Sequence, residues 1–567
     1  MTNRSEDVRN WVTKHLLLSF SIVAATWVYV LYSGVLSAPF VYDDLDQIAN
    51  NPALQSWHTV YTQFILAPVS LTSAFLGQGG STYRPLFWVS LAIDRHLWGP
   101  DASGFHFTSL LLHWLNGLLL VQLLRRLKVS PFVASVVALV WLGLPITSES
   151  VAWISARAYL LSTALILLAL LAALSYVRNK NPLSLSAFAA LALMADFSHE
   201  QGVLLVGFLT LVYLVESERP RRLWIALGAL SLLADAFYTI CKLAVGAHAG
   251  SGDRTLWSVG LKFWEYLQLI ALPIHMSPER SSAVPPHSPS LIALIAWAAL
   301  ICLIALAFFL RKRAPSVAAG LAVLLIGLLP YCGFVHIYQG MAERFTYLPA
   351  IGFVLALVGA TMLAKPFYRR AWLGCLVVGG VWVAWSAWRL TERVDDWSNP
   401  IALYRNSLQA TPRSAYLEKN LGDVYADRGE FQEAVTEYTK SLSITRNDPK
   451  TILNYAAALQ QTGNKNEAEV QYRRVTGLLP RDSRAYVDLE SLYVEENRPD
   501  DAIAMYKQAI AVDPADASAY FDLGVMFQQR GQDQDALAFY KKVLQLRPGD
   551  PQTLLYVSRL QNAGLEQ

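Results

Sequence analysis

Apolar segments of about 20 residues recur along the first 390 residues and then stop. Segments of this length can cross the hydrocarbon core of a bilayer as helices. The stretch 261–275 is shorter and contains Lys262 and Glu265, so we expect a re-entrant or interfacial helix there. The first segment follows Arg4, Arg9 and Lys14 and is expected to be an uncleaved anchor. The pattern predicts an all-α, polytopic membrane domain over 1–390 with about eleven spans, near 15–36, 105–124, 130–146, 155–176, 183–197, 200–216, 222–244, 289–310, 316–335, 345–364 and 371–390.

The last part of the chain, 391–567, has a different pattern, with a period of 34 residues. Four alanines follow this spacing, and so do four tyrosines, at Ala434, Ala468, Ala502, Ala536, Tyr438, Tyr472, Tyr506 and Tyr540. A 34-residue period with small and aromatic residues at fixed places is the tetratricopeptide-repeat signature. We expect about four full repeats over 415–548, a half-repeat near 404–412 and a capping helix at 553–565. Such a solenoid binds a protein or peptide on its concave face, and a purely structural platform is the alternative.

Composition agrees with a membrane domain. Of the 567 residues 54% are hydrophobic and only 16% are charged, where soluble proteins carry about 25%. Residues 1–390 contain 17 acids and 26 Lys or Arg, whereas residues 391–567 contain 26 acids and 20 Lys or Arg. The net charge of +3 gives no support for nucleic-acid binding. No CxxC pair occurs among the four cysteines, so disulfides and a zinc site are not expected.

The basic residues also predict orientation. Lys and Arg cluster in one set of loops, at 125–128, 178–180, 219–222, 311–313 and 365–370. By the positive-inside rule these loops face the cytoplasm. With eleven spans the loop 37–104, the segment 246–288 and the whole repeat domain then lie on the opposite side.

Ionisable side chains of both signs gather on that non-cytoplasmic side. Charges at membrane depth cost about 2.5 to 3.5 kcal/mol each, so those retained at its rim are functional candidates. Asp43 and Asp44 directly follow the first span; one of two adjacent carboxylates can act as a base while the other orients a partner. Solvated loop acids are the alternative explanation. The rim candidates are Asp43, Asp44, Asp46, Tyr83, Arg84, Asp94, His106, His113, Glu149, Arg157, His199, Glu200, Glu343 and Arg344.

Several motifs in this set resemble the transmembrane and tetratricopeptide-repeat O-mannosyltransferases, a family that joins such a membrane module to repeats. The resemblance implies the C-type glycosyltransferase fold, which takes sugars from a polyprenyl-phosphate carrier. The motifs are Tyr42-Asp43-Asp44, Tyr83-Arg84-Pro85-Leu86, Leu97-Trp98-Gly99, Phe105-His106, Glu149-Ser150-Val151-Ala152-Trp153, Glu200-Gln201-Gly202 and Ala342-Glu343-Arg344-Phe345.

The same resemblance implies roles for individual residues. Asp43 would be the base that removes the acceptor hydroxyl proton, and Asp44 the partner that orients acceptor or base. The donor phosphate would be held by Arg84, Arg157 and Arg344. Supporting or substrate-binding residues would be Tyr83, His106, His113, Glu149, Glu200 and Glu343; for the three glutamates we favour pairing with the arginines, and for the two histidines packing is at least as good an explanation.

The chain departs from the family pattern at Leu144 and Thr147, where histidines are usual, at Tyr159 in place of an aspartate, and at His199 in place of a lysine. The donor sugar and the metal dependence therefore need not match those of the family. We assign no metal ligands, and dependence on a divalent metal is the alternative.

The resulting hypothesis is transfer of a hexose, most simply mannose, from a polyprenyl phosphate to a hydroxyl acceptor, with protein Ser or Thr as the expected acceptor. The acceptor polypeptide is expected to bind the repeats. A non-catalytic membrane scaffold that assembles envelope or secretory complexes is the alternative. We expect a bacterial plasma (inner) membrane with the repeats in the periplasm; the endoplasmic reticulum membrane, with the repeats in its lumen, is the alternative compartment.

Overall fold

The computed structural model describes residues 2–66, 83–216, 220–244, 256–280, 290–333, 341–364, 369–482 and 484–562. In these ranges every regular element is a helix, which confirms the expected all-α fold. Contacts divide the chain into unit 1, Met1–Pro412, and unit 2, Arg413–Gln567. The sequence analysis places this division at 390/391, before the end of the helix that carries the last apolar segment.

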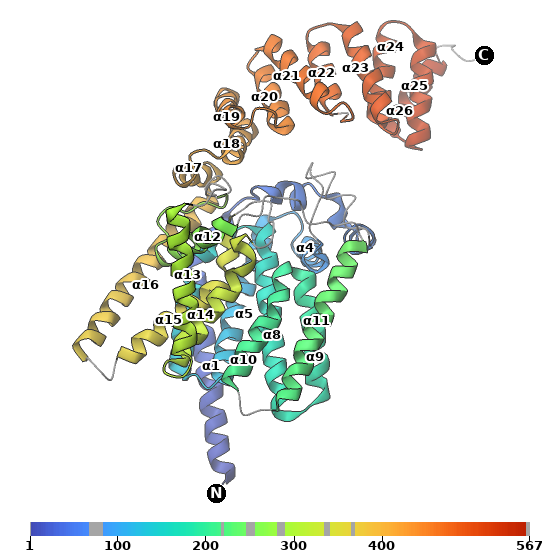
Figure 1. Ribbon diagram of the computed structural model, residues 1–567. Helices are drawn as coiled ribbons and strands as arrows, with labels where there is room; N and C mark the ends of the chain where they lie inside the picture. Colours follow the sequence, from blue (N-terminus) through green and yellow to red (C-terminus); the bar gives the residue numbers. More distant parts are fainter. Residues whose placement is uncertain are drawn as a thin grey trace. The chain divides into compact units, whose positions relative to one another are not determined.

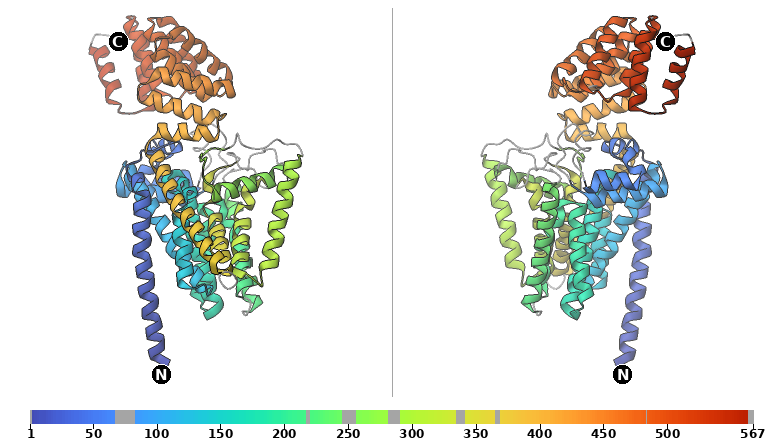
Figure 2. Two further views of the ribbon diagram at one scale, coloured as in Figure 1. Left: turned by 90° about the vertical axis from the view of Figure 1, so that its left-hand side faces the viewer. Right: turned by 90° about the vertical axis from the view of Figure 1, so that its right-hand side faces the viewer.

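Unit 1 is a helix bundle with shorter elements gathered at the end away from the amino terminus (Figures 1 and 2). The helices of the bundle are α1 (Thr2–Tyr32), α5 (Ala102–Arg126), α6 (Pro131–Leu142), α8 (Arg157–Asn179), α9 (Pro182–Ser198), α10 (Leu205–Val215), α11 (Arg221–Ala244), α13 (Leu291–Leu310), α14 (Pro315–Leu328), α15 (Pro349–Ala364) and α16 (Arg369–Ser398). The remaining helices are η1 (Ser33–Ser37), η2 (Leu45–Ala49), η3 (Pro52–Gln55), α2 (Trp57–Val60), η4 (Tyr61–Leu66), α4 (Pro85–Trp98), η5 (Pro145–Thr147), α7 (Ser148–Ala152), η6 (Ile154–Ala156), η7 (Glu200–Leu204), α12 (Leu256–Ala271), η9 (Leu329–Cys332), η10 (Glu343–Thr346) and α17 (Pro400–Ala410).

Apolar helices of membrane-spanning length identify a multi-pass membrane protein. Among the described residues seven helices are long and apolar enough to span, at Leu17–Ser37, Ala102–Arg126, Ile154–Asn179, Arg221–Ala244, Leu291–Leu310, Pro315–Cys332 and Trp372–Ser398. An eighth span is formed if Pro131–Leu142 and Pro145–Ala152, bent by 62°, count as one. Three shorter apolar helices, Pro182–Ser198, Glu200–Val215 and Pro349–Leu363, match the fifth, sixth and tenth expected spans. The count of eleven remains a prediction.

The basic loops predicted to share one side of the membrane include three segments that contact one another. Arg178, at the end of α8, donates to the backbone carbonyl of Arg126 at 2.7 Å and pairs with Glu216 at 3.0 Å. The ends of α5, α8 and α10 therefore meet at one end of the bundle, as the charge pattern predicts.

Local sequence explains where the helices of unit 1 begin. Asp101 accepts a hydrogen bond from the Ser103 N–H at 3.1 Å and so caps α5, and Asn181 caps α9 by accepting from Leu183 at 3.0 Å. Proline occupies the first helical turn of several helices, α4 and α14 among them, where its missing N–H costs nothing.

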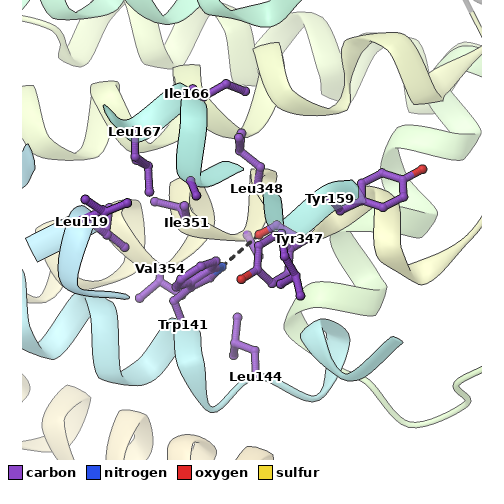
Figure 3. Packing of buried hydrophobic residues seen from close by; sticks show 14 of the residues in the cluster. Leu119, Trp141, Leu144, Tyr159, Ile166, Leu167, Tyr347, Leu348, Ile351 and Val354 are labelled. Atoms are coloured by element: carbon purple, nitrogen blue, oxygen red, sulfur yellow. Dashed lines mark hydrogen bonds between the residues drawn. The ribbon is translucent and has the colours of Figure 1, made fainter. Parts of the chain in front are cut away.

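The core of unit 1 packs around Trp141 and Tyr347 (Figure 3). The indole N–H of Trp141, on α6, donates to the Tyr347 carbonyl at 2.9 Å, and the side-chain amide of Asn116, on α5, donates to the Tyr347 hydroxyl at 3.2 Å. All three side chains are buried, so these bonds are made away from water and hold α5 and α6 against the segment before α15.

Unit 2 is the expected repeat solenoid. Its helices are α18 (Ala415–Asp427), α19 (Phe431–Ile444), α20 (Pro449–Gln461), α21 (Lys465–Leu478), α22 (Arg484–Glu495), α23 (Pro499–Val512), α24 (Ala517–Gln529), α25 (Asp533–Leu546) and α26 (Pro551–Asn562). Within each repeat the tyrosine of the second helix packs on the first: a Cβ at Gly422 would lie 2.6 Å from the Tyr438 ring, and one at Gly524 would lie 2.7 Å from the Tyr540 ring. These glycines are what allow the paired helices to approach. The end of the predicted closing helix, 563–565, lies outside the described residues.

The half-repeat expected near 404–412 is found in unit 1 instead. It is formed by α17, whose Tyr404 ring lies 4.9 Å from the ring of Tyr42. Thr411, just after α17, has its hydroxyl 3.2 Å from that of Ser277. These contacts explain why the division between the units falls after Pro412.

Candidate functional site

Asp43 and Asp44 directly follow a turn at Tyr42, and they are the helical residues that lead into η2. Asp44 is completely buried, and one of its oxygens accepts from both the backbone N–H of Ser155, at 2.8 Å, and the Ser155 hydroxyl, at 2.5 Å. Its other oxygen is buried with no hydrogen-bond partner among the described residues. Burial raises the pKa of Asp44 to about 7, against the Ser155 hydrogen bonds, which lower it. Asp43 is only half-buried, so the two carboxyl groups occupy different environments.

Tyr42 holds this turn in an unusual conformation. Its φ is +53°, in the left-handed region that bulky residues rarely adopt. The Tyr42 ring packs against Trp153, Trp397 and Tyr404, with centroids 5.8, 6.3 and 4.9 Å away. Packing on three sides thus maintains a backbone shape that is unfavourable in isolation, which is common at functional sites.

Arg157 begins α8 and is fully buried. It pairs with Asp94 of α4 at 2.6 Å and donates to the Phe105 carbonyl at 2.7 Å and to the Ser109 hydroxyl at 3.3 Å. Its charge is therefore neutralised inside the protein, by an acid that the sequence analysis did not assign to it. Buried charges require such partners, because an unpaired one is strongly destabilising.

Arg344, in η10, pairs with Glu149 of α7, which accepts both from its guanidinium and from its backbone N–H, the latter at 2.8 Å. The guanidinium also lies over the Trp153 ring, 4.9 Å from its centroid. The neighbouring Glu343 does not follow this pairing: it accepts from the Ser277 N–H and lies 3.5 Å from Arg393 of α16. Two of the three glutamates expected to pair with the predicted arginines do so, and Glu343 pairs with an arginine that the sequence analysis did not select.

Arg84 directly precedes α4 and pairs with Glu200, the first residue of η7, through its Nε and a terminal nitrogen, each 2.8 Å from Oε2. The other Glu200 oxygen accepts from Lys242, in the last turn of α11, at 3.3 Å. The imidazole Nε2 of His199 lies 3.8 Å from Glu200. The sequence analysis missed Lys242; the signal available was a lysine in the last turn of an apolar span at the same rim.

The remaining predicted residues lie in packed surroundings. The ring nitrogens of His113 are 2.7 Å from the Tyr347 hydroxyl and 3.2 Å from the Leu142 carbonyl, so this histidine has the contacts of a packing residue. His106 is fully buried near the start of α5. Tyr83 is buried as well, and its hydroxyl donates to the Ile65 carbonyl at 3.2 Å.

The four departures from the family pattern form two contacting groups. The hydroxyl of Thr147 lies 2.7 Å from that of Tyr32 and donates to the Leu144 carbonyl at 2.7 Å. The rings of Tyr159 and His199 lie 4.0 Å apart. Among the described residues no three His, Cys, Asp or Glu side chains are placed to share a metal ion.

Comparison with known proteins supports a family relationship. Family models described as tetratricopeptide repeat match residues 417–451 and 491–551. A Caenorhabditis elegans protein, "Protein O-mannosyl-transferase F38B6.6", is 22% identical over 78% of this chain and 63% of its own length. The human "Protein O-mannosyl-transferase TMTC1" is 25% identical over 73% of this chain and 54% of its own length, and the human TMTC4 protein is 25% identical over 74% and 65%. The resemblance to TMTC-type proteins is confirmed.

The chain spans between about half and two thirds of the length of these curated relatives. Among solved structures, "Crystal structure of MamA" is 23% identical, covers 28% of this chain and 92% of that one, and has a TM-score of 0.25. The "MamA 41-end from Desulfovibrio magneticus RS-1" structure is 21% identical over 28% of this chain and 92% of that one, with a TM-score of 0.26.

Proposed function

We propose that this membrane protein transfers a hexose, most simply mannose, from a polyprenyl-phosphate donor to a hydroxyl of a protein Ser or Thr. The observation that carries the proposal is the pair Asp43 and Asp44, directly after the first apolar helix, with one carboxyl buried and the other half-buried. The curated relatives, each named a protein O-mannosyl-transferase, support the same reaction class.

In the proposed reaction Asp43 is the general base. Its half-buried carboxylate accepts the proton of the acceptor hydroxyl while the hydroxyl oxygen attacks the anomeric carbon, and the bond from that carbon to the phosphate oxygen breaks. Asp44 is the positioning partner. Ser155 holds one of its oxygens, and the second, which is buried without a hydrogen-bond partner among the described residues, is proposed to orient the acceptor or Asp43.

The departing phosphate requires cationic groups, because its negative charge is released as the glycosidic bond breaks. Of the three arginines predicted to hold it, Arg157 and Arg344 are buried with carboxylate partners. Arg84 is partly exposed and shares its carboxylate with a lysine, so it is the arginine best able to reach a ligand.

Unit 2 is proposed to bind the acceptor polypeptide. Tetratricopeptide repeats present extended concave surfaces that hold peptide segments, and each full repeat of this chain retains the packed tyrosine that such a solenoid needs.

The reaction is tested by mass spectrometry of glycopeptides from cells that contain the wild-type protein, no protein, or the Asp43→Asn variant. Hexose on Ser or Thr should appear only with the wild type. The protein is a non-catalytic scaffold if the glycopeptides are the same in all three cell types, while complexes that depend on the protein are lost only in cells that lack it.

We propose that the reaction occurs on the non-cytoplasmic face. A bacterial plasma membrane with periplasmic repeats is the compartment suggested by the sequence, and the endoplasmic reticulum with lumenal repeats is the alternative. The three curated relatives named above come from animals. Fractionation of a tagged chain, with protease treatment of sealed vesicles, decides both the compartment and the side that carries unit 2.

A further inference from the structure

Three cationic or donor groups converge on the single carboxylate of Glu200. Arg84 and Lys242 approach it from α4 and α11, at 2.8 and 3.3 Å, and His199 precedes it in the chain. Two permanent positive charges thus contact one negative charge. The side chains of Arg84, Lys242 and Glu200 are 23%, 20% and 29% exposed, so the cluster is open to the surroundings, unlike the Arg157 pair, where the arginine has no exposed surface.

His199 adds a donor for which the described part of the chain provides no acceptor. Its Nδ1 accepts a hydrogen bond from the Gln201 N–H at 3.0 Å, so in the neutral ring the proton is on Nε2. Among the residues that the structure describes, that Nε2 is buried without a hydrogen-bond partner and lies 3.8 Å from Glu200, beyond hydrogen-bond distance. The Tyr159 ring, with its centroid 4.0 Å away, holds the imidazole in this orientation. A buried donor without an acceptor is costly unless a ligand supplies one.

We propose that Arg84, Lys242 and the Nε2–H of His199 bind a phosphate anion, and that Glu200 occupies the position which the phosphate takes over. Two guanidinium nitrogens of Arg84 donate to one carboxylate oxygen of Glu200, and a phosphate oxygen can accept the same two hydrogen bonds. Replacement of Glu200 by phosphate therefore conserves the Arg84 contacts. Phosphate has further oxygens, and one of these satisfies His199. The inference rests on the proposed function in one respect: it makes this cluster the donor-phosphate site and adds Lys242 and His199 to it.

The binding test uses the purified full-length protein in detergent and two probes, a short-chain polyprenyl monophosphate and inorganic phosphate. Lys242→Gln and His199→Gln should each weaken binding of the phosphate probe, by about tenfold or more for Lys242→Gln, while Lys242→Arg should restore it. Glu200→Gln should strengthen binding, because it removes the competing anion. Tighter binding of the polyprenyl probe than of inorganic phosphate identifies a lipid head group as the ligand; equal binding identifies phosphate from solution.

The matched control is Arg178→Gln, which breaks the interhelical ion pair of Arg178 with Glu216, at the end of the bundle where the basic loops lie, and should leave binding unchanged. Melting temperatures show which variants are folded, and if Lys242→Gln is not folded, His199→Gln tests the same claim. Unchanged binding in the folded variants, or weaker binding by a folded Glu200→Gln variant, overturns the proposal.

Transfer measured on the same samples separates this inference from the proposed function. If the wild type transfers no sugar but phosphate binding falls in Lys242→Gln, the anion site stands and the glycosyltransferase proposal fails. If Lys242→Gln and His199→Gln transfer sugar at the wild-type rate over a range of donor concentrations, the anion site fails and the glycosyltransferase proposal stands.

Discussion

Ser155 donates both its backbone N–H and its hydroxyl to the same oxygen of Asp44, at 2.8 and 2.5 Å. The two residues are 111 positions apart, so the contact ties the turn after the first apolar helix to the segment that leads into α8. It also gives the two oxygens of Asp44 different surroundings, since the other oxygen has no hydrogen-bond partner in the described part of the chain. A carboxyl group held by one oxygen can present the other in a fixed direction.

The first prediction concerns the two acids. Asp43→Asn should lower sugar transfer by about 10² to 10⁴, the usual contribution of a general base. Asp44→Asn should lower it as well, because an amide cannot reproduce the carboxylate's acceptor pattern. Transfer is measured with purified protein, a polyprenyl-phosphate sugar and acceptor peptides.

Asp46→Asn is the matched control for these variants. Asp46 lies in the same segment, in η2, but is exposed. Its substitution should leave transfer within about twofold of wild type, as is usual for a surface change. Equal losses in all three variants would contradict a specific role for Asp43 and Asp44.

The second prediction is a pH dependence of stability. The folded-state pKa of Asp44 is raised to about 7 by burial, above the value of about 3.9 for an unfolded chain. Between these values the unfolded state releases a proton that the folded state keeps, so the contribution of Asp44 to stability falls as pH rises from about 4 to about 7. The difference in melting temperature between wild type and Asp44→Asn should therefore change with pH over this window.

The Ser155→Ala variant tests the cause of this pH dependence. Loss of the hydroxyl removes a hydrogen bond that lowers the pKa of Asp44, so the pKa should rise further. The fall in stability should then extend to higher pH than in wild type. A window that moves to lower pH would show that Ser155 does not act on the carboxylate as described.

The third prediction compares two ion pairs. Glu149→Gln leaves the buried guanidinium of Arg344 without a charge partner, and breaking a buried pair costs about 3 to 5 kcal/mol. Glu392→Gln breaks the exposed pair with Arg389, which should cost about 1 kcal/mol or less. Thermal unfolding in detergent should show a large drop in melting temperature for the first variant only.

The fourth prediction concerns the repeats. Gly422→Ala places a Cβ 2.6 Å from the Tyr438 ring and should separate α18 from α19. Gly477→Ala, in an exposed stretch of α21 with open space around it, should be neutral or stabilising by about 0.4 to 1 kcal/mol. Limited proteolysis of the full chain should cut the first variant faster within unit 2 and leave the second like wild type.

Much of the architecture could be predicted because it depends on local and periodic signals. Length and apolarity mark the membrane helices, and the 34-residue period marks each repeat at a fixed place. The boundary between units was harder to predict, because α17 has the size of a repeat helix and is assigned to unit 1 by its contacts there, such as that of Tyr404 with Tyr42.

The pairings at the site could not be predicted from local signals. Glu149 and Arg344 are 195 positions apart, and the sequence offers several arginines to each acid at the rim. Glu343 and Arg344 are neighbours in the chain, yet they pair with different partners, Arg393 and Glu149. Lys242 was missed for the same reason, since only the packing of α11 near η7 brings it to Glu200.

The aromatic contact of Tyr42 with Tyr404 places the acid-bearing turn next to α17, the last helix before the chain leaves unit 1. Trp397, at the end of α16, packs on the same ring. The backbone of the residue that precedes Asp43 is therefore anchored on the helix from which the chain continues toward the repeats, so a substitution that loosens α17 should also disturb the position of Asp43.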